Sequence, residues 1–173
     1  HDHRCSILHG WIHRRTHWPK LQHAQPLFNL ESPRRMTNFP QIGPGWTLFL
    51  DRDGVINERI FDSYILDWSA FRFTEGLLEN AAQIGAAFAH IIVVTNQQCI
   101  AKGLLLPEQL EEIHQRMCNE LQKAGLTVDF VLVATEFKNG LPQRRKPHTT
   151  MALEAQARFP NIDFQKSIMV GDT

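Results

Sequence analysis

From residue 46 onward, hydrophobic positions alternate between short continuous runs and helical stripes. Short apolar runs rich in β-branched residues and bounded by turn residues are typical of strands buried on both faces. Such runs predict strands at 46–50, 90–95, 128–134 and 167–171. Apolar residues spaced three and four apart predict amphipathic helices at 75–89, 107–124 and 149–158. Strand and helix therefore alternate along most of the chain.

This alternation predicts the fold class. The clearest helix begins at Pro107, has Glu108 in its first turn and stops at Gly125, which are the expected start and stop signals. Strands that alternate with helices form a mainly parallel sheet covered by helices on both faces. We therefore expect an α/β fold, a three-layer Rossmann-like parallel sheet.

Residues 1–45 do not share this pattern. Six of the nine histidines lie there, at spacings that repeat no metal-ligand pattern, and neither helical nor strand periodicity is present. Met36 reads as a natural start with a short lead into the first strand. We expect 1–45 to be an N-terminal extension, disordered or non-native, and 46–173 to be the folded domain.

Charge and cysteine usage exclude some classes of protein. The chain has 173 residues, with 18 Lys and Arg against 18 Asp and Glu, so its overall charge favours neither nucleic acid nor membrane. No apolar run approaches the roughly 20 residues of a membrane span. The three cysteines form no C-x-x-C pair, which is typical of a reducing compartment. We expect a monomeric cytoplasmic protein with neither a membrane nor a nucleic-acid partner.

Polar residues follow several of the predicted strands. Asp51 and Asp53 follow the first strand, Thr95 ends the second and Asp172 follows the fourth, while Lys146 precedes the last helix. Each alone could be a turn former, a strand-end hydroxyl or a solvated charge. Parallel strands end at one edge of a sheet, however, so these groups can converge. Three aspartates, a hydroxyl and an ammonium suit a phosphoester together with Mg²⁺, which prefers oxygen ligands.

In this order, Asp51-Arg-Asp53-Gly-Val, Thr95, Lys146 and Gly171-Asp172 resemble the four motifs of the haloacid dehalogenase (HAD) superfamily of phosphatases. The resemblance covers residues 46–173 and implies roles by position. Asp51 would be the nucleophile, Asp53 the general acid and base, Thr95 a phosphate ligand and Lys146 a charge stabiliser. Mg²⁺ would be held by Asp51, Asp53 through its carbonyl, and Asp172.

Further motifs resemble the short-cap branch that contains D-glycero-D-manno-heptose 1,7-bisphosphate phosphatase and histidinol-phosphate phosphatase. They are Asp51-Arg-Asp-Gly-Val-Ile-Asn57, the 95–103 segment Thr-Asn-Gln-Gln-Cys-Ile-Ala-Lys-Gly, and Arg145-Lys-Pro-His148. The resemblance implies a minimal cap, a small phosphorylated sugar as substrate and the heptose 7-phosphate as the favoured scissile group. It implies substrate contacts for Asp62, Ser63, Tyr64, Asn96, Gln97 and Arg145; a guanidinium suits a second phosphate.

The chain departs from this branch in three places. The segment before Arg145 lacks the branch's cysteine loop, so we do not expect structural zinc. Cys99 stands where the branch has glycine, and would cost about 1 kcal/mol if that position required a positive φ. The superfamily normally continues beyond the position of Thr173 to another acidic metal-site residue, so we expect a chain truncated at its C-terminus.

Three alternatives stay open from the sequence. Histidinol phosphate is hardly distinguished from the heptose as a substrate. Val131-Leu-Val-Ala-Thr135, followed by a short cysteine-free loop into Arg145-Lys146-Pro147, also resembles polynucleotide 3′-phosphatases. Finally, the chain could be a catalytically inactive module that keeps the fold for binding.

Overall fold

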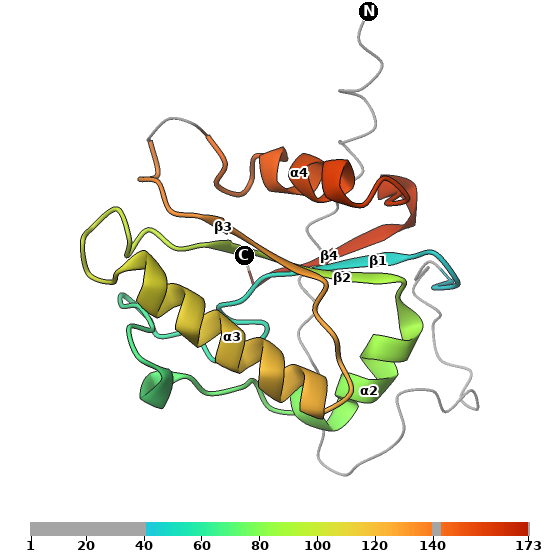
Figure 1. Ribbon diagram of the computed structural model, residues 1–173, viewed down its shortest axis with the longest axis horizontal. Helices are drawn as coiled ribbons and strands as arrows, with labels where there is room; N and C mark the ends of the chain where they lie inside the picture. Colours follow the sequence, from blue (N-terminus) through green and yellow to red (C-terminus); the bar gives the residue numbers. More distant parts are fainter. Residues whose placement is uncertain (1–40, 140–142, 173) are drawn as a thin grey trace, which may run out of the picture.

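The computed structural model describes residues 41–139 and 143–172, and its centre is a four-stranded parallel sheet. The strands lie in the order β3-β2-β1-β4, which places the first strand of the chain inside the sheet (Figure 1). Their bounds are β1 Thr47–Leu50, β2 His90–Asn96, β3 Phe130–Ala134 and β4 Ser167–Val170. Leu50 is in register with Val93 of β2 and with Val170 of β4, so these strands end together.

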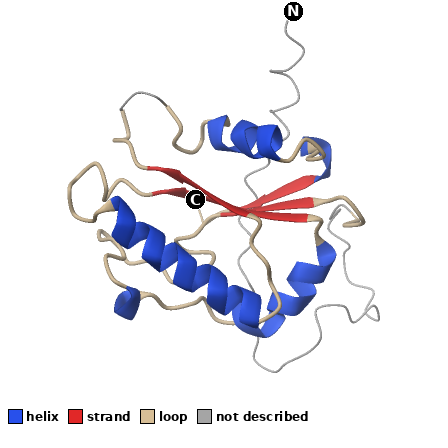
Figure 2. Cartoon of the chain, in the orientation of Figure 1, coloured by secondary structure: helices blue, strands red, loops and turns tan. Residues whose placement is uncertain are grey.

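Three α-helices cover the sheet from both sides. Helices α2 (Leu77–Ala87) and α3 (Pro107–Lys123) lie on one face, and α4 (Thr150–Arg158) lies on the other (Figures 1 and 2). The segment from β1 to α2 contains only a 3₁₀ turn, η2 (Trp68–Ala70), and a second turn, η3 (Phe164–Lys166), leads into β4. The expected three-layer α/β fold is confirmed.

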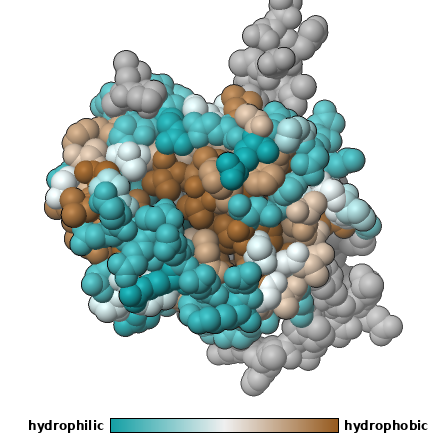
Figure 3. Space-filling view, viewed as in Figure 1, coloured by the Kyte–Doolittle hydropathy of each residue, from teal (hydrophilic) through white to brown (hydrophobic). Residues whose placement is uncertain are grey.

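Alternating side chains of the strands supply two hydrophobic cores. Leu48, Leu50, Ile91 and Val93 face α2 and α3, where buried residues such as Met117 complete the larger core. The strand residues that alternate with these, Phe49, Ile92 and Val94, face α4 and form the smaller core with its Met151, Ala152 and Ala155. In Figure 3, hydrophobic residues show as a band between the more polar surfaces of α3 and α4. Burial on both faces explains why the strands have continuous apolar sequences.

The predicted elements are all present, and their ends differ from the predictions by two residues at most. The helix predicted at 75–89 begins later because Gly76 has φ 80°, a left-handed conformation that is not helical. Helix α3 begins at Pro107, as predicted, and the Gln109 side chain accepts a hydrogen bond from the Leu106 N–H (2.9 Å). Gly125, with φ 97°, follows its end.

Three further expectations concern Cys99, membrane-spanning helices and the N-terminal extension. Cys99 is fully buried, and among the described residues only Asp62 is a non-glycine with positive φ, so Cys99 carries no such strain. In the described part of the chain, no helix has the length and apolar character needed to cross a membrane. Most of the expected extension, residues 1–40, lies outside the described residues, so that boundary stays a prediction.

Candidate active site

The carboxyl ends of β1 and β2 meet the loop that leads into α4. Asp51 follows β1 directly, and its Oδ2 forms an ion pair with Lys146 Nζ. Asn96, the last residue of β2, fixes the backbone of Lys146 from the other side. Its Oδ1 accepts from the Lys146 N–H (3.0 Å), and its Nδ2 donates to the Lys146 carbonyl (3.3 Å). Segments distant in sequence therefore present one carboxylate and one ammonium to each other.

Asp53 is surrounded by hydrogen-bond donors. Its Oδ1 accepts from Arg52 Nη2 (2.7 Å) and Asn57 Nδ2 (3.1 Å), and its Oδ2 accepts from Gln97 Nε2 (2.8 Å). Burial raises the pKa of this carboxyl, but the Arg52 charge and these hydrogen bonds outweigh burial and hold the pKa below its usual value. Asp53 is therefore held as a carboxylate in a fixed orientation.

Gln97 connects Asp53 to Thr95. The Gln97 side chain is fully buried, and the same Nε2 that reaches Asp53 also donates to Thr95 Oγ1 (2.8 Å). Because Thr95 Oγ1 accepts this bond, its own O–H can donate to another group. Gln97 is thus a buried bridge between two site residues, and its expected contact with substrate stays a prediction.

Asp51 has the opposite electrostatic balance from Asp53. Burial raises the pKa of its carboxyl, and the Lys146 charge, together with the Arg52 N–H that donates to Asp51 Oδ1 (2.8 Å), offsets only part of this effect. A buried carboxylate with this balance gains stability from any additional cation beside it. The ionised form that a nucleophile requires is therefore the form that a bound metal would favour.

Asp172, at the other end of the described chain, returns to this site because β4 pairs with β1. Gly54 has φ 82°, and a Cβ at this position would clash with the Asp172 carboxylate. The glycine that follows Asp53 is therefore required both by its left-handed backbone and by this close approach. Asp172 Oδ2 accepts a hydrogen bond from Arg59 Nη1 (2.9 Å).

The charge on Arg59 is influenced by all three of the expected metal ligands. Asp172 raises the pKa of the Arg59 guanidinium, and the charges of Asp51 and Asp53 add to the effect. All three carboxylates thus act on a single cation, and hard oxygen donors of this kind suit Mg²⁺. Within residues 41–139 and 143–172, no three acidic, histidine or cysteine side chains are placed so that they could hold a metal ion, so a complete ligand set needs backbone or water oxygens as well. The donor set fits Mg²⁺ by its chemistry, and the joint binding of one metal ion by these residues stays a prediction.

The residues expected to contact substrate are more widely spread than the residues expected to be catalytic. Asp62 and Ser63 are exposed in the segment between β1 and α2, and no described contact joins either to the residues around Asp51. Tyr64 is half-buried, and Lys102 Nζ lies 5.0 Å from the centre of its ring. Arg145 precedes Lys146 directly and is half-buried. Of the expected substrate residues, Asn96, Gln97 and Arg145 therefore adjoin the site.

Arg52 and His114 shape the site and were missed by sequence reasoning. Arg52 is 1% exposed, and besides Asp53 its Nη1 contacts Nε2 of the buried His114 (3.3 Å). Burial and the Arg52 charge lower the pKa of His114 to about 3, which keeps this ring neutral. Arg52 could have been predicted as a site residue, because it stands between Asp51 and Asp53 in the sequence. For His114 the sequence shows only a position on the apolar face of α3.

Comparison with known proteins identifies the family of this chain. The family model described as polynucleotide kinase 3 phosphatase matches residues 50–173. A D-glycero-alpha-D-manno-heptose-1,7-bisphosphate 7-phosphatase of Mycobacterium tuberculosis is 33% identical over 131 residues, which cover 76% of this chain and 69% of that protein. The chain belongs to the HAD superfamily of phosphatases. A D-glycero-beta-D-manno-heptose-1,7-bisphosphate 7-phosphatase of Vibrio cholerae is 35% identical over 132 residues, covering 72% of this chain and 69% of that protein.

Solved structures of HAD phosphatases share the fold. The D,D-heptose 1,7-bisphosphate phosphatase of B. bronchiseptica, solved with magnesium and phosphate, superimposes with a TM-score of 0.62 at 27% identity. The match covers 66% of this chain and 64% of that one. A Mesorhizobium loti protein named as a HAD-like phosphatase gives a TM-score of 0.62 at 32% identity, covering 73% of this chain and 63% of that one. The chain thus spans slightly less than two thirds of either solved relative.

Proposed function

We propose that this protein is a Mg²⁺-dependent phosphatase that hydrolyses a phosphomonoester of a small sugar through an aspartyl-phosphate. The ion pair between Asp51 and Lys146 supports this most directly, because it joins a potential nucleophile to a cation that can stabilise the phosphoryl group. The favoured substrate is D-glycero-D-manno-heptose 1,7-bisphosphate, cleaved at its 7-phosphate. Relatives named for this activity support that choice.

The first half-reaction uses residues on both sides of the phosphorus atom. An Asp51 carboxylate oxygen attacks phosphorus in line, the bond from phosphorus to the sugar oxygen breaks, and Asp53 gives its proton to the departing oxygen. Lys146 neutralises charge on the transferring group, and the Thr95 hydroxyl donates to one of its oxygens. Asp51, Asp172 and the Asp53 carbonyl would hold Mg²⁺, which offsets the repulsion between carboxylate and phosphate.

The second half-reaction hydrolyses the aspartyl-phosphate and regenerates the free Asp51 carboxylate. Asp53, now ionised, takes a proton from a water molecule, whose oxygen attacks phosphorus and releases phosphate and the Asp51 carboxylate. The Asp53 carboxylate that Arg52 and Gln97 hold in place is the form that this step needs. Because the same contacts lower the pKa of Asp53, its protonation for the first step has to accompany the arrival of the negatively charged substrate.

The description of the matching family model favours a second candidate, a polynucleotide 3′-phosphatase. The exposed side chains of Phe61 and Phe137, in the segments that follow β1 and β3, could stack on bases in such a role. Histidinol phosphate is a third substrate to be considered. A catalytically inactive binding module is the alternative from outside the enzymes.

A substrate panel tests these alternatives. Phosphate release is measured with the full-length protein and Mg²⁺ on the heptose bisphosphate, on histidinol phosphate and on a 3′-phosphorylated oligonucleotide. We expect the highest kcat/KM on the heptose bisphosphate, and no release by the Asp51→Asn variant. Preference for the oligonucleotide or for histidinol phosphate would replace the proposed substrate. Binding of substrate without release from any of the three would favour the inactive module.

A further inference from the structure

The segment that precedes Lys146 is held by a carboxylate outside the proposed catalytic set. Glu136 lies just after β3, and its Oε1 accepts hydrogen bonds from the backbone N–H groups of Arg144 and Arg145, both at 2.7 Å. These backbone hydrogen bonds help to hold the pKa of Glu136 below its usual value, against the raising effect of burial. One ionised oxygen therefore ties the end of β3 to the two residues before Lys146.

Arg144 adds a second attachment through its side chain. Its guanidinium makes a two-pronged ion pair with Glu154 of α4, through Nε (2.8 Å) and Nη2 (2.5 Å). Its Nη1 donates to the Val133 carbonyl in β3 (2.8 Å). A planar fork of this kind fixes orientation as well as distance. The segment is thus attached both to the sheet and to the helix that follows it.

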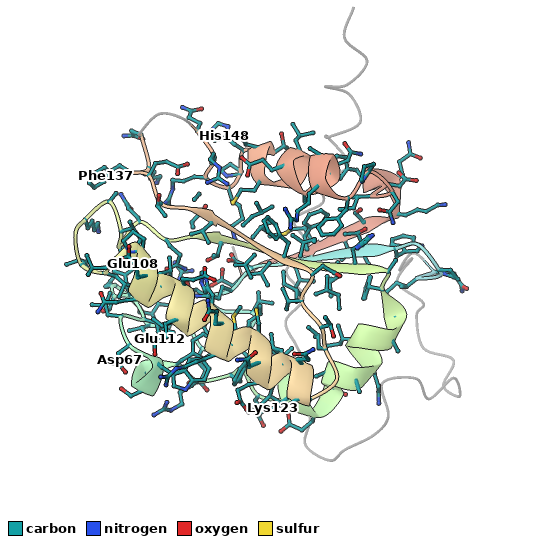
Figure 4. The ribbon with its side chains drawn as sticks, viewed as in Figure 1. Asp67, Glu108, Glu112, Lys123, Phe137 and His148 are labelled. Carbon is teal, nitrogen blue, oxygen red and sulfur yellow. The ribbon has the colours of Figure 1, made fainter. Side chains whose placement is uncertain are left out.

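Together, Glu136, Arg144 and Glu154 form a clamp next to the proposed catalytic lysine. Figure 4 labels Phe137, which follows Glu136 beyond the end of β3, and His148, which lies at the approach to α4. The clamp holds the chain just before Lys146, and Asn96 holds the Lys146 backbone itself. Asn96 of β2 therefore holds the Lys146 backbone directly, and groups from β3, from Glu136 beyond its end and from α4 hold the two residues before it.

We propose that Glu136 and Arg144 are positioning residues that act through Lys146 by keeping its Nζ against Asp51. This inference rests on the proposed function. A lysine side chain has four rotatable bonds and makes no bidentate contact, so a fixed backbone is needed to hold its ammonium group at one point. Displacements of about 1 Å at a reacting centre can lower rates by about 100-fold. A clamp that touches neither substrate nor metal can therefore control turnover.

The test compares Glu136 variants in steady-state phosphate release and in thermal unfolding. We expect Glu136→Ala to lower kcat by about 10- to 100-fold with KM changed less than about threefold. Glu136→Gln keeps an oxygen that accepts both N–H groups, and should retain most of the activity. Glu112→Ala, which removes an exposed carboxylate of α3 that pairs with Arg116, is the matched control and should leave kcat unchanged.

Each variant is then remade in the Lys146→Ala background. If Glu136 acts through Lys146, adding Glu136→Ala to Lys146→Ala should lower the residual kcat by less than about twofold. An equal fold-loss in both backgrounds would overturn the inference, as would unchanged kcat in Glu136→Ala or a loss of kcat that only follows a large fall in Tm. Failure of the wild-type protein to release phosphate would instead count against the proposed function, so the two failures are distinguishable.

Discussion

Arg52 shows at the scale of one residue how the site is built into the core. Its guanidinium is 1% exposed and lies between the Asp53 carboxylate and the His114 ring. A buried cation is tolerated when an anion pairs with it, and a second cation beside it would be costly. His114 therefore has to remain neutral for the fold to be stable.

This requirement predicts an acid-sensitive contribution to stability. In the folded chain the pKa of His114 is lowered to about 3, from the usual 6.5. As pH falls below 6.5, His114 binds a proton in the unfolded chain but stays neutral in the folded chain. The free energy of unfolding therefore decreases between pH 6.5 and about 3. Above pH 6.5 the contribution is fully present.

His114→Gln should remove this pH dependence while keeping an oxygen that can accept from Arg52. Urea unfolding at pH 6 and pH 4 measures the effect. We expect the wild-type protein to lose about 2 kcal/mol more than the variant between these two values. Equal losses in the two proteins would show that His114 titrates alike in the folded and unfolded chains.

At the scale of the elements, close backbone contact between α2 and the chain after α3 depends on a glycine. Gly85 lies within α2, and a Cβ there would clash with the Gly125 carbonyl and lie 3.3 Å from Leu126 Cα. The sequence indicated only that glycine interrupts a helical stripe, which intrinsic propensity counts as a weakness. The contact explains why glycine is required at this position.

This contact predicts that a substitution which normally stabilises a helix will destabilise α2. Gly85→Ala should lower the free energy of unfolding by about 1–3 kcal/mol, because the methyl group forces the two backbones apart. Ala86→Gly, at the exposed neighbouring position, serves as the control and should cost about 1 kcal/mol from propensity alone. Chemical denaturation measures both, and stabilisation by Gly85→Ala would contradict the described packing.

Features marked by a pattern of neighbouring residues in the sequence were predicted, and features that depend on contacts between distant segments were not. The strands were recognisable because burial on both faces makes their sequences continuously apolar. The turns Trp68–Ala70 and Phe164–Lys166 were missed because a single 3₁₀ turn has no periodicity, only an aspartate cap (Asp67 or Asp163). Lys146 was expected from its motif. Glu136 and His114 were not, because their roles depend on chain segments that meet only in the fold.

At the scale of the whole molecule, the parallel sheet joins both ends of the described domain at one site. Arg59 comes from the segment after β1 and Asp172 from the end of β4, and their ion pair spans these ends (2.9 Å). If Asp172 holds Mg²⁺, the Arg59 guanidinium competes with the metal for the same carboxylate. Arg59 should therefore weaken the binding of Mg²⁺.

Calorimetric titration with Mg²⁺ alone tests this competition. Because an exposed ion pair contributes about 1 kcal/mol at most, Arg59→Gln should tighten binding by about two- to fivefold. Asp172→Asn should weaken it strongly, and Arg116→Gln, which removes the exposed pair with Glu112, should leave it unchanged. Weaker binding by Arg59→Gln would mean that the guanidinium supports the metal site.

The central claim is that Asp51 receives the phosphoryl group at the meeting point of these strands. Borohydride reduces an aspartyl-phosphate to homoserine, so quenching the full-length protein with borohydride during turnover and sequencing its peptides by mass spectrometry locates the phosphorylated residue. The account predicts homoserine at position 51 in the wild-type protein and none in Asp51→Asn. Homoserine at another aspartate, or phosphate release with no modified residue, would contradict it.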